Sequence, residues 1–520
     1  MSFTDSEKNK YLRYALFFGF SFIFGVIVYL SLLSQSLVNT LDGLWSSNYY
    51  LSHSWELSIG RWLWLFLDRF RGGISCNPIN GYLTILLISA GNTFLADSFS
   101  MVNKRGLLLS AIILSSTTIC SFLSYRYMSP VFGGSFCLAV ICSWAIIKIE
   151  KQTWKYLISA ASLCLSLGLY QANIACTCTI LLVYFIFLCA KAEENRLMRS
   201  YVLDCIIVIA AGCIAYKIIW DIFMAYFHLE ASEYNGADSV SLRNMLNSLP
   251  SSLARTYGYF ADYFFSNSWV KHSLLQYAPV FVLLFLFTIG TIVIFSVRKS
   301  GWKWNTLLVI LSLLVVPIVS NISILLAPEA DYLIQQTGGM AILLPVLLMA
   351  VFALLDYQGI RINSALPLTA AILSVLVLYG NAYATATDLD AMSEGRKSSE
   401  SIMNLVVGML GIDEEDLLDS SKEYYFIGTI DENPLFNVSE LWYRANDYAQ
   451  FGRFKNTSYS MRVSYGGVLR EMGINCAIGP DELYYPIIYS EDFQKLNVFP
   501  SSESVMVSDN YVIVKMSQNY

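Results

Sequence analysis

A carboxylate with apolar and aromatic neighbours follows the first long apolar run of the sequence, in the stretch Asp42-Gly43-Leu44-Trp45. A carboxylate at such a position can act as a general base toward a hydroxyl group. Burial against Leu41, Leu44 and Trp45 would raise its pKa toward a useful range. The same pattern is also typical of a helix cap or of a solvated acid. The spacing alone therefore marks Asp42 as a candidate base without excluding a structural role.

A basic residue, Arg61, opens the next notable stretch, Arg61–Arg71, which is apolar in its middle and basic at its ends. It is too short to span a bilayer, so it predicts a helix lying in the membrane interface. Arg61 can hold a lipid phosphate through paired hydrogen bonds, or it can be a plain interfacial anchor. The nearby aromatic residues suit a membrane interface and would equally stack on sugar rings. They are Trp45, Tyr49, Tyr50, Trp55, Trp62 and Trp64.

Arg126, in Tyr125-Arg126-Tyr127, is a second candidate for binding phosphate and is also typical of an interfacial anchor. Metal chemistry has less support. The three histidines are isolated, and most of the 11 cysteines lie within apolar runs, where they fill space. No cluster has metal-ligand spacing, so no metal or other cofactor is predicted, although outer-loop carboxylates leave a weak divalent site open.

The composition decides which class of protein must position these residues. Of 520 residues, 56% are apolar and only 14% are charged, with a mean hydropathy of +0.52. Soluble domains are about 25% charged, and a soluble globule of this composition would expose large apolar patches. A wholly soluble enzyme and a disordered chain are therefore excluded. The net charge of −6 argues against a nucleic-acid partner. The sequence predicts a polytopic α-helical membrane protein.

The apolar runs predict eleven membrane-spanning helices, because a bilayer core takes about 20 apolar residues as helix. Basic residues precede the first run and no cleavage site of small residues follows it, so this run is predicted to be a signal anchor. The predicted spans are 12–34, 79–97, 107–124, 130–147, 156–171, 172–190, 201–225, 273–297, 305–327, 339–355 and 364–382.

The distribution of basic residues predicts the orientation. With the N-terminus in the cytoplasm, the inside loops hold 15 Lys and Arg, whereas the longer outside loops hold 7. Short cytoplasmic loops carry such an excess. Eleven crossings then place the C-terminal segment outside, together with a first outer loop at 35–78 and a second at 226–272. Any chemistry of these loops is therefore expected on the extracytoplasmic side of the cell membrane.

The C-terminal segment differs in composition from the rest. Residues 382–520 hold 10 Lys and Arg against 21 Asp and Glu, so we predict a membrane domain at 1–382 and a small α/β domain at 383–520. Ser399–Leu410 is predicted to be a helix that ends at Gly411. Tyr424–Ile427 is a predicted strand, and Val505–Val507 with Tyr511–Lys515 predicts a hairpin.

Four short motifs resemble the serotype-converting glucosyltransferase family of bacteria, whose members are polytopic and resemble the wider GT-C glycosyltransferases. The motifs are Asp42-Gly43-Leu44-Trp45, Trp55-Glu56-Leu57-Ser58-Ile59-Gly60-Arg61-Trp62, Asn77-Pro78 and Ser166-Leu167-Gly168-Leu169-Tyr170-Gln171. The tail is also similar, with a strand that ends in Gly428 and with Phe499-Pro500-Ser501 before the final strands.

The resemblance implies a mechanism. The donor would be a polyprenyl-phosphate-linked sugar, with glucose as the family default, and the acceptor a cell-surface glycan of the O-antigen type or its lipid-linked precursor. Asp42 would deprotonate the acceptor hydroxyl for attack with inversion. Arg61 would stabilise the departing phosphate, where negative charge develops. Glu56 would orient Arg61 or contact a sugar hydroxyl, and Tyr170 and Gln171 would line the donor pocket.

The sequence departs from the family pattern at one position. Many members carry two consecutive acids where this chain has Asp42 followed by Gly43. If the mechanism needs a second carboxylate, it must come from elsewhere. The candidates are Glu56, Glu329 and Asp331.

Two other functions fit a polytopic chain. The first is a transporter or polymerase of lipid-linked glycans. A transporter is expected to show internal repeats and a charged path near the membrane midplane, and the sequence shows neither clearly. The second is a nonenzymatic membrane scaffold whose tail binds a partner. That scaffold predicts that Asp42→Asn leaves function intact.

Overall fold

The structure is a computed structural model that describes residues 5–39, 42–46, 48–234, 242–266, 278–328, 333–357, 365–411, 418–419, 421–440, 442 and 458–520. Within these ranges, the side chains of residues 5–8, 42, 242, 266 and 458–463 are not described. The side chain of Asp42 and the whole of Glu329 and Asp331 therefore lie outside the described part.

Long apolar helices dominate the fold. Within the described residues, eight helices are long and apolar enough to cross a membrane. They are α1 (Asp5–Val28), α6 (Ile79–Ser98), α9 (Ser129–Lys148), α11 (Ile174–Ala190) taken together with the 3-10 turn before it as Gln171–Ala190, α12 (Asn195–Phe227), α15 (Ala278–Ser300), α18 (Gly338–Leu355) and α19 (Ala365–Leu410). A ninth candidate is the pair α7 (Lys104–Leu114) and α8 (Thr117–Ser124), which is bent by 54°. The protein is thus a polytopic helical membrane protein.

Two of the eleven predicted spans correspond to helices that do not meet the same criteria. Helix α16 (Trp304–Ser320) is apolar but has only 17 residues. Helix α10 (Gln152–Leu169) begins with Gln152 and Lys155 and carries several serines, which lower its hydropathy. The described residues of all eleven predicted runs are mainly helical, whereas the number of crossings stays a prediction.

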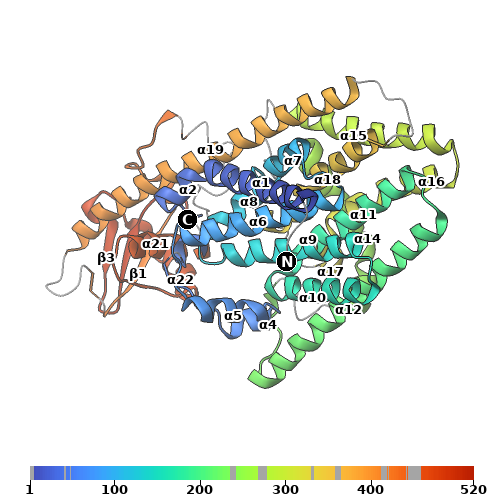
Figure 1. Cartoon of the computed structure of the whole chain (residues 1–520). Coiled ribbons are helices and arrows are strands. Elements are labelled where there is room, and N and C mark those ends of the chain that lie inside the picture. Colours follow the sequence, from blue (N-terminus) through green and yellow to red (C-terminus); the bar gives the residue numbers. More distant parts are fainter. Residues whose placement is uncertain are drawn as a thin grey trace.

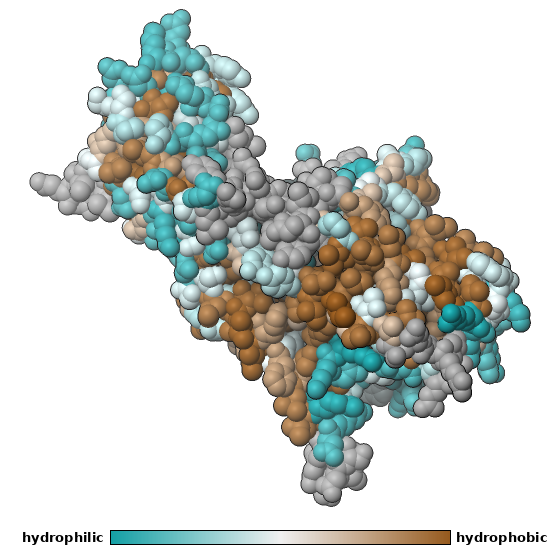
Figure 2. Space-filling view, turned by 90° about the horizontal axis from the view of Figure 1, so that it is seen from above, coloured by the Kyte–Doolittle hydropathy of each residue, from teal (hydrophilic) through white to brown (hydrophobic). Residues whose placement is uncertain are grey.

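The surface of the helical region is apolar where a soluble protein would be polar. Large side chains such as Phe20, Ile214 and Leu286 are more than half exposed on different long helices. Figure 2 shows hydrophobic residues gathered over this region, while the lobe at the left is largely hydrophilic on the face shown. This separation fits a helical region that faces lipid, because apolar side chains are favourable there and the backbone polar groups are satisfied within each helix.

The described part of the first predicted outer loop, 35–78, contains three short helices, α3 (Asp42–Trp45), α4 (Ser54–Ser58) and α5 (Trp62–Arg71). Helix α2 (Leu30–Gln35) lies almost wholly within the first predicted span, 12–34, and ends where the predicted loop begins. His53 caps α4: its ring nitrogen accepts from the Trp55 amide, and the Glu56 carboxylate accepts from the His53 amide at 2.8 Å. This is a capping box with histidine at the first position. The helix predicted within Arg61–Arg71 is confirmed as α5, which ends at Gly72.

Short elements connect the remaining long helices. The turn between α10 and α11 is the 3-10 helix η1 (Gln171–Asn173). Helices α13 (Leu242–Asn247), α14 (Leu249–Ala261) and the π-helical turn η3 (Asp262–Ser266) lie between α12 and α15. Helix α17 (Ile322–Leu326) and the 3-10 helix η5 (Ile334–Gln336) lie between α16 and α18.

The C-terminal segment contains one four-stranded sheet in the order β2-β1-β4-β3. Its strands are β1 (Glu423–Ile427), β2 (Ala477–Ile478), β3 (Val505–Val507) and β4 (Tyr511–Lys515). Strand β1 is parallel to β2 and β4, while β3 and β4 form an antiparallel hairpin. The predicted strand and the predicted hairpin are confirmed. Helices α21 (Ser458–Glu471), α22 (Tyr484–Ile488) and α23 (Glu491–Lys495) and the short 3-10 helices η6 (Ile430–Glu432), η7 (Asp481–Leu483) and η8 (Ser502–Ser504) complete the segment.

Both faces of the sheet are buried. Successive side chains of a strand point to opposite faces. Accordingly, Tyr424 and Phe426 pack in one apolar cluster, whereas Tyr425 and Ile427 pack in another. The first cluster also includes Leu44 of α3. The core of the C-terminal segment therefore continues into the first outer loop.

Helix α19 connects the helical region with the sheet without a break. It runs from Ala365 to Leu410, through the predicted domain boundary at 382–383, and Figure 1 shows it extending along both parts. It ends where the sequence predicts, at Gly411, whose φ of +89° places it in the left-handed region. The two parts are thus joined by a rigid element.

Hydrogen bonds of Asn433 connect separate stretches of the C-terminal segment and are predicted to stabilise it. Its buried amide donates to the carbonyls of Phe499 and Met516, and its oxygen accepts from the Leu435 amide. We expect Asn433→Ala to lower the free energy of unfolding by about 1–3 kcal/mol, because two buried carbonyls lose their donor. Thermal unfolding of the full chain in detergent measures this. Asn404→Ala, at an exposed position, is the control; equal effects of the two variants would contradict the prediction.

Candidate active site

A cavity of about 330 Å³ lies among segments that are far apart in the sequence. Arg61 lines it from the corner between α4 and α5, and Tyr170 and Gln171 line it from the turn between α10 and α11. Three of the predicted site residues therefore meet in one place. The other lining residues are Ile59, Leu167, Ala172, Ile174, Cys213, Tyr216, Trp220, Tyr234, Ser323, Ile324, Leu326, Ala327 and Gln336.

The Arg61 guanidinium faces this cavity without a carboxylate partner. Its Nε is buried and has no hydrogen-bond acceptor, and within the described residues Arg61 forms no ion pair. Its Cζ lies 5.1 Å from the Tyr170 ring centroid and 6.0 Å from that of Trp64. Aromatic faces attract a cation but cannot neutralise its charge. The arrangement is therefore suited to an anion that enters the cavity.

Hydrogen bonds from two other elements hold the corner before Arg61. Gln171 Nε2 donates to the Ile59 carbonyl at 2.6 Å and to the Tyr216 hydroxyl at 3.0 Å. The Tyr216 hydroxyl in turn donates to the Gly60 carbonyl at 3.1 Å. Gly60 has a φ of +85°, and a Cβ there would overlap the Tyr216 hydroxyl. Glycine at this position is therefore required by both conformation and space.

The second motif packs directly on the first. A Cβ on Gly168 would lie 2.6 Å from the Trp62 ring, so the absence of a side chain lets α10 contact α5. The Ser166 hydroxyl donates to the Ser135 carbonyl on α9 at 2.8 Å and fixes this end of α10. The Ser166–Gln171 stretch thus positions Arg61 as well as lining the cavity.

Glu56 lies beside this corner but does not line the cavity. Its side chain is fully buried and accepts hydrogen bonds from the Tyr50 hydroxyl and from the His53 amide. Its backbone carbonyl accepts from the Arg61 amide at 2.8 Å. Burial and the Glu56 carboxylate raise the pKa of Tyr50, which keeps this hydroxyl a donor. The structure places Glu56 where it holds the α4–α5 corner.

The two predicted tryptophans lie on different sides of the loop. Trp55 is 38% exposed, and its ring meets that of Tyr234, a cavity residue, edge-on at 5.4 Å. Trp45 instead lies under the Arg470 guanidinium of α21, with Cζ 3.7 Å from its ring centroid. Trp55 is thus next to the cavity, and Trp45 belongs to the contact with the C-terminal segment.

Asp42 is the first residue of α3. The position of this helix is fixed by its neighbours: the Gly43 amide donates to Asn39 Oδ1 at 3.1 Å, and the Asn39 amide donates to the Ser124 carbonyl at 3.0 Å. A Cβ on Gly43 would lie 2.7 Å from the Ser124 carbonyl oxygen. A second acid at position 43 would therefore not fit without movement of its neighbours.

Arg126 lies outside the cavity, in a buried ion pair. Its guanidinium contacts Glu471 of α21 at 2.6 Å, and both side chains are about 5% exposed. It also donates to Asn48 Oδ1 at 3.2 Å. Burial lowers the pKa of Arg126, and the Glu471 carboxylate opposes that shift. Unlike Arg61, this arginine has its carboxylate partner within the protein.

Several cavity residues escaped the sequence analysis. Tyr216 and Trp220 come from α12, Tyr234 follows it, and Ser323, whose hydroxyl is buried without a partner, comes from α17. None lies in a recognisable motif. A metal site finds no support either: within the described ranges, no group of three or more His, Cys, Asp or Glu residues could hold a metal ion.

The fold defines a polytopic membrane protein, and its first long loop contributes Arg61 to a cavity between the helices. Residues 39–340 match the sequence model of the family described as glucosyl transferase GtrII. The chain therefore belongs to this family of glucosyltransferases, as the motifs predict. The match includes Asp42, Arg61 and all the elements that line the cavity. No curated protein matches the sequence.

The clamped corner predicts a specific effect of Gly60→Ala. The new Cβ would displace Tyr216 or the Arg61 backbone, and small misplacements of a binding group can cost about 100-fold in rate. We expect at least a tenfold loss of glucosyltransferase activity, measured at wild-type expression level. Gly72→Ala is the matched control, because Gly72 also has a positive φ but no atom within 4 Å of its Cβ position. Similar losses in both variants would attribute the effect to backbone strain alone.

Proposed function

We propose that this protein is a membrane glucosyltransferase that moves glucose from a polyprenyl-phosphate-linked donor to a cell-surface glycan, with inversion. The observation that carries the proposal is Arg61: its guanidinium lines an apolar cavity, its Nε is buried without an acceptor, and it has no ion-pair partner within the described residues. Burying an uncompensated charge is costly. A phosphate diester that carries a lipid supplies both the missing charge and an apolar chain.

The cavity supports the donor part of this proposal. Its volume of about 330 Å³ is at the lower end of the range for small-molecule sites. Ile174, Ile324 and Leu326 form an apolar wall that suits the first isoprene unit, while the Arg61 guanidinium provides hydrogen-bond donors. When the bond between the anomeric carbon and the phosphate oxygen breaks, the electron pair goes to the phosphate, and Arg61 would stabilise that charge.

Asp42 is proposed as the base. It would take the proton of the acceptor hydroxyl while the hydroxyl oxygen attacks the anomeric carbon from the face opposite the phosphate, which inverts the configuration. The Asn39 and Ser124 contacts that fix α3 support a defined position for this residue. Glu56 and Arg126 are already engaged with protein partners, which favours positioning roles for both.

The orientation is also part of the proposal. The excess of basic residues on alternate loops supports a cytoplasmic N-terminus and an extracytoplasmic C-terminal domain at 383–520. The cavity and α3 would then lie on the extracytoplasmic side, where the acceptor glycan is present. The bilayer would hold the donor lipid.

The donor assignment predicts the behaviour of Arg61→Gln. Removing the only charge proposed to meet the leaving phosphate should lower kcat about 100-fold or more and raise KM for the donor. Purified full-length protein, assayed with a short-chain polyprenyl-phosphate glucose, measures both constants. Arg69→Gln, on the exposed face of α5, should retain wild-type constants. An Arg61→Gln variant with an unchanged kcat would refute the phosphate role.

The complete function is tested by surface-glycan composition and linkage in cells. Cells lacking the gene would be compared with cells restored with the wild type or with Asp42→Asn at equal membrane levels. We expect both the deletion and Asp42→Asn to lose one glucose side branch. Full rescue by Asp42→Asn would remove Asp42 from the chemistry. Loss or shortening of the whole polymer on deletion would instead support a transporter or polymerase.

A further inference from the structure

Helix α21 of the C-terminal segment packs on α3, the short helix that begins with Asp42. We infer that α21 positions α3 and thereby Asp42, the residue proposed to activate the acceptor. Glu471, the last residue of α21, holds α21 itself in place. The inference rests on the proposed role of Asp42. It assigns a catalytic purpose to a domain that lies beyond the residues matched by the family.

Two consecutive glycines let the helices meet closely. A Cβ on Gly466 would overlap the Trp45 ring, and one on Gly467 would lie 2.6–2.9 Å from Leu44 atoms that include its carbonyl oxygen. The backbone of α21 therefore rests directly on α3. A contact of this kind transmits position accurately, because no flexible side chain separates the two backbones.

Arg470 adds a polar contact one turn further along α21. Its Nη1 donates to the Trp45 carbonyl at 2.9 Å, at the C-terminal end of α3, and its guanidinium stacks on the Trp45 ring. A cation at this end of a helix also interacts favourably with the helix dipole. Helix α21 thus contacts both the ring of Trp45 and its backbone carbonyl.

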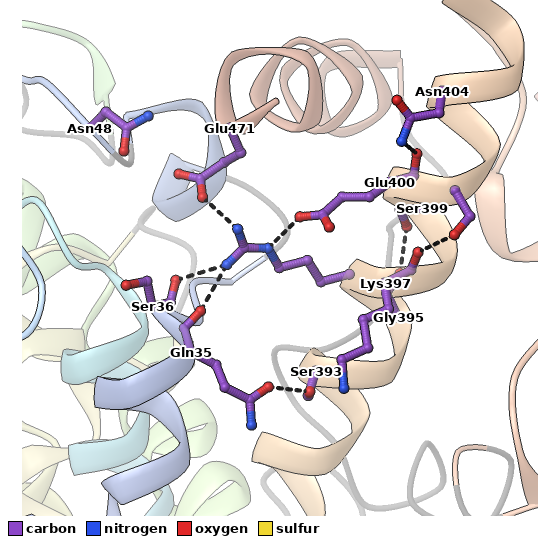
Figure 3. Close-up of polar contacts among 12 residues, drawn as sticks. Gln35, Ser36, Asn48, Ser393, Gly395, Lys397, Ser399, Glu400, Asn404 and Glu471 are labelled. Carbon is purple, nitrogen blue, oxygen red and sulfur yellow. Dashed lines mark hydrogen bonds and ion pairs between the residues drawn. The ribbon is translucent and has the colours of Figure 1, made fainter. Parts of the chain in front are cut away.

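Glu471 ties α21 to the segments on both sides of α3. One carboxylate oxygen pairs with Arg126, and the other pairs with Arg396 of α19 at 3.0 Å. Arg396 also donates to the Gln35 and Ser36 carbonyls, which precede α3, whereas Arg126 donates to Asn48, which follows it. Figure 3 shows Glu471, Glu400 and the end of α2 converging on this point. The Arg126–Glu471 pair is buried and therefore little weakened by solvent, whereas the Arg396 side chain is 25% exposed.

The donor half is built from other elements. Arg61, Gln171 and Tyr216 belong to the α4–α5 corner, η1 and α12, and none of the described residues of the C-terminal segment lines the cavity. A displacement of α21 should therefore disturb Asp42 while leaving donor binding unchanged. This separation gives a kinetic signature that a general loss of stability would not produce.

The test uses Gly467→Ala in the full-length protein, assayed with a short-chain polyprenyl-phosphate glucose and the acceptor glycan. We expect kcat to fall at least tenfold, the donor KM to stay within twofold of wild type, and the thermal unfolding midpoint to change little. Gly408→Ala is the matched control, because Gly408 is an exposed helical glycine with no atom within 4 Å of its Cβ position. If Gly467→Ala does not fold, Arg470→Ala replaces it, with the same expectation.

A double-mutant comparison separates this inference from the proposed function. In an Asp42→Asn background, Gly467→Ala should cause no further loss, because both changes act through one group. A Gly467→Ala protein with wild-type kcat, or one whose loss adds fully to that of Asp42→Asn, would overturn the inference while the proposed function stands. A fully active Asp42→Asn would overturn the proposed role of Asp42, and the inference with it.

Discussion

The guanidinium of Arg61, which lines the cavity with its Nε buried and without an acceptor, is the feature on which the rest of the site depends. A cation inside an apolar cavity is unfavourable unless something compensates its charge. The protein supplies aromatic faces at 5.1 and 6.0 Å but no carboxylate within the described residues. The surrounding structure must therefore hold Arg61 in place while leaving its charge available. The capping box at His53, the clamp of Gln171 and Tyr216, and the contact between Gly168 and Trp62 all serve this requirement.

Arg126 shows the opposite solution for the same residue type. Arg126 is more deeply buried than Arg61, and Glu471 lies 2.6 Å away and neutralises its charge. That partner comes from a position 345 residues later in the chain. The pair therefore serves to join the C-terminal segment to the helical region. Arg61, which is proposed to bind the donor phosphate, and Arg126, which has a structural role, therefore differ in the neighbours that the fold provides.

The C-terminal segment is closely integrated with the helical region. Helix α19 continues from one into the other, Leu44 of the first loop packs in the core below the sheet, and α21 rests on α3. The proposed site consequently has two supports. The helical region builds the donor cavity, and the C-terminal segment fixes the short helix that carries Asp42. In the proposed reaction, separate parts of the protein would therefore position the donor and the residue that activates the acceptor.

The sequence by itself determined the local features of this protein. Apolar runs predicted where helices lie, glycines at 411 and 428 predicted where elements end, and the motifs predicted that Arg61, Tyr170 and Gln171 belong to one site. These features depend on neighbours along the chain. The tertiary structure alone decided that Tyr216 and Ser323 join the cavity, that Glu471 pairs with Arg126, and that Gly43 has no room for a second acid. Each of these three contacts depends on how segments that are distant in the sequence pack together. The sequence of one segment carries no periodic pattern that indicates which side chains of another segment it will meet.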